Sequence, residues 1–201
     1  MSAVADIAIL FDSDTNDLWT EYRASRDFTE VHDVLLKLSD DDISLPDSLR
    51  SLNAHGELAS FIDRPDRRGR SPLAWACEHG LGDAARVLIE FGADPNQSRR
   101  SVKGASPLLH LAVAGPGSRR SREVVKTLLR AGVDVNAKDD EQWTAMHVAA
   151  SWDLCDIAVE IAQEGPDLSA VTDTGCSALD LAVCAEASDT MIALLRNHSC
   201  Y

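Results

Sequence analysis

Apolar residues follow helical spacing through the first third of the chain. Between residues 12 and 39 they recur with a helical period, and the same spacing returns between residues 49 and 62. The acidic run Asp40–Asp42, with Pro46 close behind it, interrupts the pattern. We therefore expect three or four helices here, with no strict internal period.

From Asp66 onward the pattern repeats. Each repeat begins with a side-chain hydroxyl followed by an apolar run, an arrangement that favours a capped helix start. The hydroxyls are spaced 35, 38 and 33 residues apart. A period of this length indicates a stack of small units. The four predicted capping residues are Ser71, Ser106, Thr144 and Ser177.

A second apolar run completes each unit and ends at Gly92, Gly132 or Gly165 in the first three. Glycine suits the left-handed conformation that ends a helix. In three units 21 residues separate the cap from the terminating position, which leaves room for two short antiparallel helices. The second unit has 26, and the excess falls in Gly115–Arg122. We expect a loop insertion there.

The unit resembles the ankyrin repeat, whose 33-residue signature has a T-P-L-H-x-A-A helix start and a G-A-D-V-N-A end. In the last two units Ala145 and Ala178 replace the proline, and an extra residue in the second unit predicts either that His110 is shifted or that its turn is bulged. The last unit lacks the glycine terminator, as expected of a repeat that caps the stack. The resemblance rests mainly on Asp66, Gly69, Ser71, Pro72, Leu73, Ala76, Gly92, Ala93, Asp94 and Asn96 in the first clear unit, Pro107, His110, Gly132, Asp134 and Asn136 in the second, Thr144, His147, Ala149 and Ala150 in the third, and Gly175, Ser177, Leu179 and Ala182 in the fourth.

The resemblance implies an all-α ankyrin-repeat solenoid with finger-like loops between stacked helix pairs. We expect residues 1–62 to form an N-terminal helical cap that can include a degenerate repeat. Four repeats are expected at about 66–97, 98–137, 138–170 and 171–201. The low aromatic content, 5%, agrees with helices packed through Ala, Leu and Val.

Charge is segregated along the chain. The net charge of −14 divides into −10 for residues 1–63, +7 for 64–130 and −11 for 131–201. An acidic protein repels the nucleic-acid backbone, so we expect no nucleic-acid partner. The basic segment predicts a patch on loops between Arg64 and Arg122, facing either an acidic or phosphorylated partner segment or the chain's own acidic N-terminus.

No motif for catalysis, a cofactor or a metal is apparent. His110 and His147 occupy the position where the family has a structural histidine, and Cys77 and Cys184 are expected to be buried, with Cys176 the most exposed thiol. Five cysteines form no CxxC pair, and no signal peptide or membrane span is apparent, which predicts an intracellular, cytoplasmic protein. We predict a non-enzymatic protein; an enzyme site using His32 or His55 of the N-terminal segment is the weaker alternative.

The resemblance implies a protein–protein interaction module that binds through finger loops and the concave face of the first helices. A dedicated inhibitor or immunity-type protein that blocks a basic enzyme site is the alternative. Trp143, at a finger tip, and Trp152 are the main candidate anchors, because aromatic and arginine side chains dominate interfaces. The predicted contact residues are Arg67, Arg68, Arg70, Trp75, Glu78, His79, Lys103, Asp140, Gln142, Trp143, Ser151 and Trp152.

Overall fold

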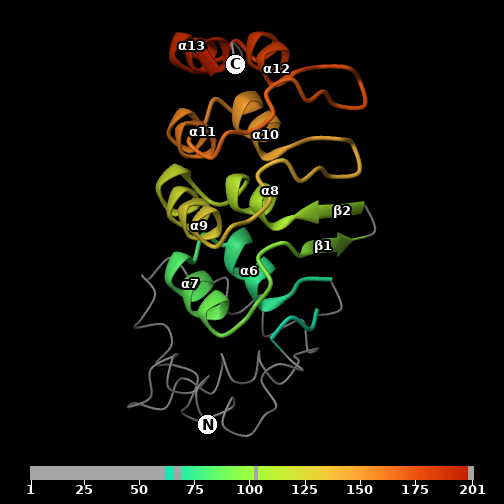
Figure 1. The fold of residues 1–201 in the computed structure, drawn as a ribbon, viewed down its shortest axis with the longest axis vertical. Helices are drawn as coiled ribbons and strands as arrows, with labels where there is room; N and C mark the ends of the chain where they lie inside the picture. Colours follow the sequence, from blue (N-terminus) through green and yellow to red (C-terminus); the bar gives the residue numbers. More distant parts are fainter. Residues whose placement is uncertain (1–61, 66–68, 102–103, 199–201) are drawn as a thin grey trace, which may run out of the picture.

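Four helix pairs follow one another in the part of the chain that the computed structural model describes, residues 62–65, 69–101 and 104–198 (Figure 1). The predicted cap over residues 1–62 lies outside this part, apart from Ile62. The pairs are α6 (Pro72–Glu78) with α7 (Gly82–Glu90), α8 (Leu108–Val113) with α9 (Ser118–Arg130), α10 (Ala145–Ser151) with α11 (Cys155–Ala162), and α12 (Ala178–Cys184) with α13 (Asp189–His198).

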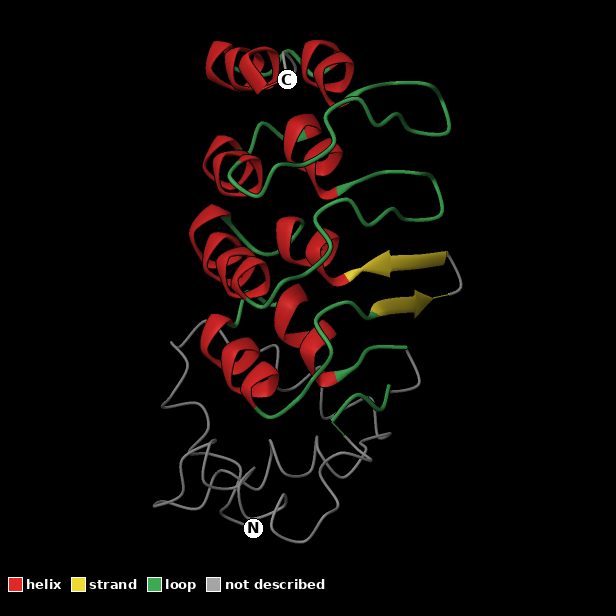
Figure 2. Ribbon diagram, in the orientation of Figure 1, coloured by secondary structure: helices red, strands yellow, loops and turns green. Residues whose placement is uncertain are grey.

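The helices form two columns (Figure 2). The first helices of successive pairs pack on one another in one column, and the second helices pack in the other. Long loops, the fingers, project from the side of the first-helix column (Figure 2). In the finger that leads into α8, strands β1 (Ser98–Ser101) and β2 (Gly104–Pro107) pair antiparallel. The prediction of an all-α solenoid is confirmed, with one short hairpin added.

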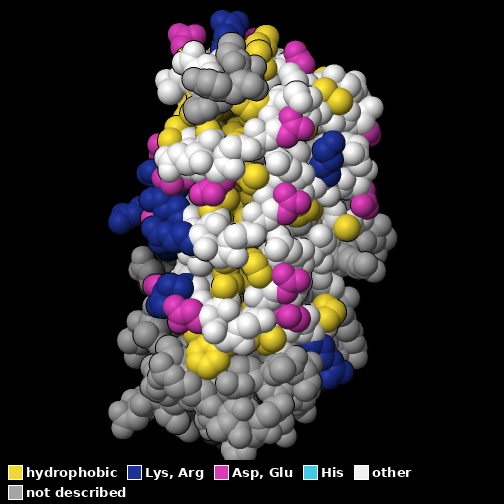
Figure 3. Space-filling model, in the orientation of Figure 1, with side chains coloured by type: hydrophobic (Ala, Val, Ile, Leu, Met, Phe, Trp, Pro, Cys, Tyr) yellow, Lys and Arg dark blue, Asp and Glu magenta, His cyan; other side chains and the backbone are white. Residues whose placement is uncertain are grey.

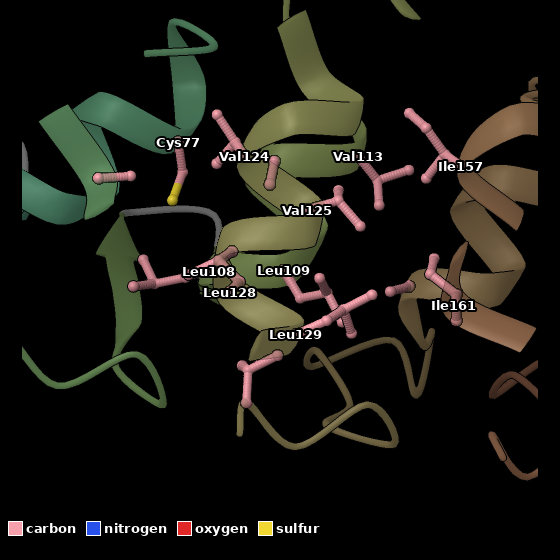
Figure 4. Packing of buried hydrophobic residues seen from close by; sticks show 14 of the residues in the cluster. Cys77, Leu108, Leu109, Val113, Val124, Val125, Leu128, Leu129, Ile157 and Ile161 are labelled. Atoms are coloured by element: carbon pink, nitrogen blue, oxygen red, sulfur yellow. The ribbon is translucent and has the colours of Figure 1, made fainter. Parts of the chain in front are cut away.

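Apolar side chains from both columns interlock between the units (Figure 4). Leu108, Leu128 and Ile157 are at most 1% exposed. Burying a side chain of this size contributes about 2 kcal/mol to stability. The small Ala149 and Ala150 are fully buried on α10, where a short side chain allows close helix packing. The low aromatic content is thus offset by dense aliphatic packing.

Three of the four predicted capping residues are N-caps: Ser71, Thr144 and Ser177. Ser106 as a cap is wrong. It lies in β2 opposite Arg99, and α8 begins one residue later than predicted, with Pro107 at the N-cap.

The extra residue of the second unit is therefore in the finger hairpin. His110 stands three residues after its N-cap, as His147 does after Thr144. Of the two alternatives, a shifted His110 is wrong; the added residue changes the preceding turn, where strand pairing absorbs it before the helix starts.

The predicted loop insertion at Gly115–Arg122 is wrong as well. Gly117, with φ of 101°, ends a tight turn and is the N-cap of α9. The chain then continues the amphipathic pattern, with Ser121 and Val124 buried, so the added residues lengthen α9 to 13 residues. The arginines of this stretch thus belong to a helix.

Side-chain amides join successive units. Asn96 Oδ1 accepts a hydrogen bond from the Asp134 N–H at 2.8 Å, and Asn136 Oδ1 accepts one from the Asp167 N–H at 2.8 Å. Each of these asparagines is held in its turn by the aspartate two residues before it, at 2.9 Å in both units. Because the same bond recurs at two successive junctions, it fixes the rotation of the first three units against one another.

Candidate partner-binding face

Two buried histidines connect the first helices α8 and α10 to the finger of the next unit. His110 Nε2 donates to the Trp143 carbonyl at 2.8 Å, and His147 Nε2 donates to the Ala170 carbonyl at 3.1 Å. Burial lowers the pKa of both imidazoles. Neutral rings with a proton on Nε2 therefore position the fingers, in agreement with the structural role predicted for them.

Their other ring nitrogens differ. His147 Nδ1 accepts from the Thr144 N–H at 3.1 Å and lies 2.8 Å from the Thr144 hydroxyl. Among the described residues, His110 Nδ1 is buried without a hydrogen-bond partner. Pro107, at the matching N-cap, has neither an N–H nor a hydroxyl to offer.

Direct bonds also join neighbouring fingers. The exposed Asp140 accepts from the Ala105 N–H at 3.0 Å, across to the preceding finger. The Glu141 carbonyl accepts from the Asp173 N–H of the next finger at 3.1 Å. The three fingers therefore form one connected surface before any partner arrives. Gln142, exposed at the tip with φ of 62°, is part of it.

Trp143 is half-buried rather than fully displayed. The centroid of its ring lies 6.2 Å from that of His147. Its backbone N–H donates to the Asp139 carboxylate at 2.8 Å, and its backbone carbonyl accepts from His110. The residue therefore helps to hold the finger, and only part of its ring can meet a partner.

Trp152 is 58% exposed, more than any other large apolar side chain of the described residues. It is the C-cap of α10 and follows Val148 by four residues and Ser151 by one, which puts the three on one side of the helix. Gly115 and Ala185 occupy the same register in the neighbouring units, four residues after Leu111 and Leu181. More than half of Trp152 is thus open to solvent at the end of α10.

A half-buried apolar row beside Trp152 was not predicted. In each of the last three units the fourth residue after the N-cap is aliphatic and half-buried, and its helix packs on the neighbouring first helix. The signal was present in the sequence as an apolar residue at a fixed distance from each cap. We call the surface formed by Leu111, Val148, Ser151, Trp152 and Leu181 the first-helix face.

The predicted contact residues of the first unit that the structure describes contact one another. Glu78 pairs with Arg70 at 3.8 Å and with Arg99 of β1. Trp75 meets His79 edge-on, with ring centroids 4.5 Å apart. Arg70 and Trp75 are 7% and 5% exposed, which leaves them little surface for a partner. Arg67, Arg68 and Lys103 lie outside the described residues.

Of the described arginines in the predicted basic loops, those between Ser118 and Arg122 lie apart from the fingers. Arg99 is in a finger strand, whereas Arg119, Arg120 and Arg122 lie on α9 in the second-helix column. Figure 3 shows Lys and Arg side chains gathered at one edge, at the level of α9. The physical reason is the helical conformation of the inserted stretch, which moves its arginines away from the fingers.

The cysteines follow the prediction in part. Cys77 is fully buried, and burial raises the pKa of its thiol. Cys184 is exposed, contrary to expectation, because no described unit packs over the outer side of α12; Cys176 is half-buried. Within the described ranges no group of three metal-ligating side chains occurs, and none of the helices there is long and apolar enough to cross a membrane.

Comparison with known proteins places this geometry in a family. A family described as "Ankyrin repeats (3 copies)" matches residues 47–139 and 109–201. The match begins inside the predicted N-terminal cap and covers well over half of the chain.

Several curated relatives share the repeats. Neurogenic locus notch homolog protein 2 of Homo sapiens is 32% identical over 165 residues, 80% of this chain and 6% of that protein. Ankyrin repeat domain-containing protein 63 of Mus musculus is 32% identical over 95 residues, 47% of this chain and 24% of its own. Alpha-latrocrustotoxin-Lt1a of Latrodectus tredecimguttatus is 33% identical over 118 residues, 58% of this chain and 8% of the toxin.

The chain thus spans about a quarter or less of the length of these relatives. The similarity covers between 47% and 80% of this chain. On this match and this architecture, the chain belongs to the ankyrin-repeat family, whose repeats are protein–protein interaction modules.

Proposed function

We propose that this chain is a non-enzymatic recognition module that binds a partner protein through its first-helix face, with Asp140, Gln142 and the exposed part of Trp143 adding contacts from the fingers. The observation that carries the proposal is Trp152, a tryptophan 58% exposed beside an aliphatic row. Tryptophan at the centre of an apolar patch is a common energetic hot spot in interfaces.

The apolar row gives this anchor a surface to extend. Leu111, Val148 and Leu181 are each half-buried at the same register of successive helices. A partner helix or loop laid along the column would cover all three and the indole together. Exposed apolar surface of this kind, bordered by the polar fingers, is typical of an interaction site.

Preorganisation supports the same function. The bonds from Asp140 to Ala105 and from Asp173 to Glu141 hold the fingers together in the free protein. A surface that is already ordered loses little conformational entropy on binding. The repeat scaffold therefore favours specific recognition over adaptable, low-affinity contact.

The test is affinity capture from cells that make the protein, followed by identification of the partner and measurement of its affinity. Trp152→Ala should remove capture, and Trp143→Ala should weaken it less, because Trp143 is partly buried. Val159→Ala is the matched control, since Val159 is 38% exposed on α11 of the second-helix column. Undiminished capture by Trp152→Ala, or loss with Val159→Ala, would place the interface elsewhere.

The adaptor and inhibitor versions of this function differ in salt dependence. A dedicated inhibitor that uses acidic ends against a basic site would lose affinity steeply between about 50 and 500 mM salt. The apolar first-helix face predicts a weak dependence, so we propose an adaptor. The described cysteines are free thiols, which supports an intracellular and, we propose, cytoplasmic location.

A further inference from the structure

A groove lined by arginines lies between α7 and α9, on the second-helix column. It has a volume of about 620 Å³, and its lining includes Arg86, Arg119, Arg120 and Arg130 together with the acidic Asp83 and Glu123. We call it the arginine groove. It lies on the second-helix column, whereas the first-helix face lies on the first. It takes no part in the function proposed above.

Two of these arginines are exposed and lack a side-chain partner among the described residues: Arg119 and Arg130. Other cations nearby are already paired. Arg122 and Lys126 both reach Glu160 of α11, at 2.5 and 3.5 Å, and Arg86 pairs with Glu90 at 2.7 Å. The positive charge that remains for a ligand is thus at the two ends of α9.

The distance between these two arginines sets the form of the ligand. They are eleven residues apart in one helix, which is close to three full turns, so both project to the same side about 16 Å apart. An isolated phosphate or carboxylate cannot touch both. An extended peptide rises about 3.3 Å per residue, and acidic side chains about five residues apart would reach them.

The acidic residues of the groove exclude a uniformly charged ligand. Glu123 lies on α9 between the two free arginines, and Asp83, whose side chain is 95% exposed, lies across the groove on α7. Together with the net charge of −14, they would repel a continuous polyanion such as a nucleic acid. A peptide with acidic ends and a neutral centre fits this alternation.

We propose that the arginine groove binds an extended acidic segment of a partner protein, with two carboxylate clusters about five residues apart. Arg119 would hold one cluster and Arg130 the other. The guanidinium group can meet a carboxylate with two parallel hydrogen bonds, which gives the contact direction as well as charge. The groove is a second docking surface, and the chain can hold two segments on its two columns at once.

The experiment uses fluorescence anisotropy with the full chain and a labelled peptide in which two Glu pairs are joined by a Gly-Ser-Gly spacer. A comparison peptide of the same composition has its four Glu residues contiguous. The spaced peptide should bind more tightly than the contiguous one. Arg119→Ala with Arg130→Ala should weaken the spaced peptide about tenfold, because two charged contacts are lost.

Three controls separate this proposal from others. Arg64→Ala with Lys138→Ala removes the same charge from exposed positions outside the groove and should leave binding unchanged. Trp152→Ala should also leave it unchanged, so failure here is distinguishable from failure of the proposed function. The proposal is overturned if the spaced peptide does not bind at 50 mM salt, if the groove variant binds it normally, or if a labelled oligonucleotide binds better.

Discussion

The second and third units have the same helix pair but expose different chemistry. The second carries a hairpin finger, a proline at the N-cap of α8 and a long, arginine-rich α9. The third has a Thr144–His147 cap, a short α11 and the exposed Trp152. One unit is specialised on the second-helix column and the other on the first.

The difference between the two units shows which positions of this scaffold tolerate substitution. Buried positions such as Leu108 and Ala145 keep the stack, and both units retain the histidine that bonds to the next finger. Variation is concentrated at caps, turns and exposed helix positions, which do not decide the packing. Function is therefore expected at the positions where one unit departs from its neighbour.

The largest expected effect concerns the two histidines. His147→Ala removes the bonds to Thr144 and Ala170 and leaves both backbone groups unsatisfied, at a cost of about 3 kcal/mol in the free energy of unfolding. His110→Ala loses one bond and removes an unpaired nitrogen, so about 1 kcal/mol is expected. Urea unfolding of both variants measures the difference, and equal costs would refute the unequal roles assigned to the rings.

The pH dependence comes next. The pKa of both histidines is lowered in the folded protein. At a pH below the ordinary histidine pKa of about 6.5, the unfolded chain therefore binds more protons than the folded protein does. Their contribution to stability is present above that pH and is lost as the pH falls below it. The urea midpoint should drop between about pH 7.5 and 5.5, and His110→Gln with His147→Gln should reduce that drop. An unchanged drop would show that other groups cause it.

A smaller effect is expected at the finger tips. Gly104 has φ of 124°, and an added Cβ would collide with the Asp140 carboxylate. Gly104→Ala should cost about 1–2 kcal/mol through backbone strain and this clash. In an Asp140→Ala background, which already lacks the bond to Ala105, the clash is absent and only the strain remains, so Gly104→Ala should cost less than in the wild type. No cost in that background, or the same cost as in the wild type, in thermal unfolding would show that only one of the two causes operates.

The smallest effect is expected from a substitution that makes the cap of the second unit more like that of the third. Pro107→Thr gives α8 an N-cap residue with a hydroxyl and a backbone N–H. Either group can serve as the hydrogen-bond partner that His110 Nδ1 lacks. A stabilisation of about 1 kcal/mol is expected from the restored cap. Ser106→Ala is the control, since that residue does not cap α8. Destabilisation by Pro107→Thr would mean that the hairpin requires proline at this position.

The sequence predicted the helix pairs because capping hydroxyls and terminating glycines act locally. It failed where two local signals competed. Ser106 has a capping side chain, but antiparallel pairing with Arg99 draws it into a strand. Gly115–Arg122 has turn-forming glycines, yet the residues after Gly117 form the first turns of α9.

The candidate site was predictable in type but not in detail. Burial of Trp75 and the partial cover of Trp143 depend on contacts that residue spacing alone does not reveal. The exposure of Trp152 likewise depends on how α10 packs in the first-helix column. Counting four residues from the cap finds the aliphatic position in the third and fourth units, Val148 and Leu181, whereas the misplaced cap at Ser106 gives His110 in the second.

The most direct test of the central claim is the affinity of the captured partner for the wild-type chain, Trp152→Ala and Val159→Ala, measured by isothermal titration calorimetry. Trp152→Ala should weaken binding by at least about 30-fold, as expected for a hot-spot tryptophan, and should leave the helical circular dichroism unchanged. Val159→Ala should bind as the wild type does. Equal affinity of all three proteins would contradict recognition through the first-helix face.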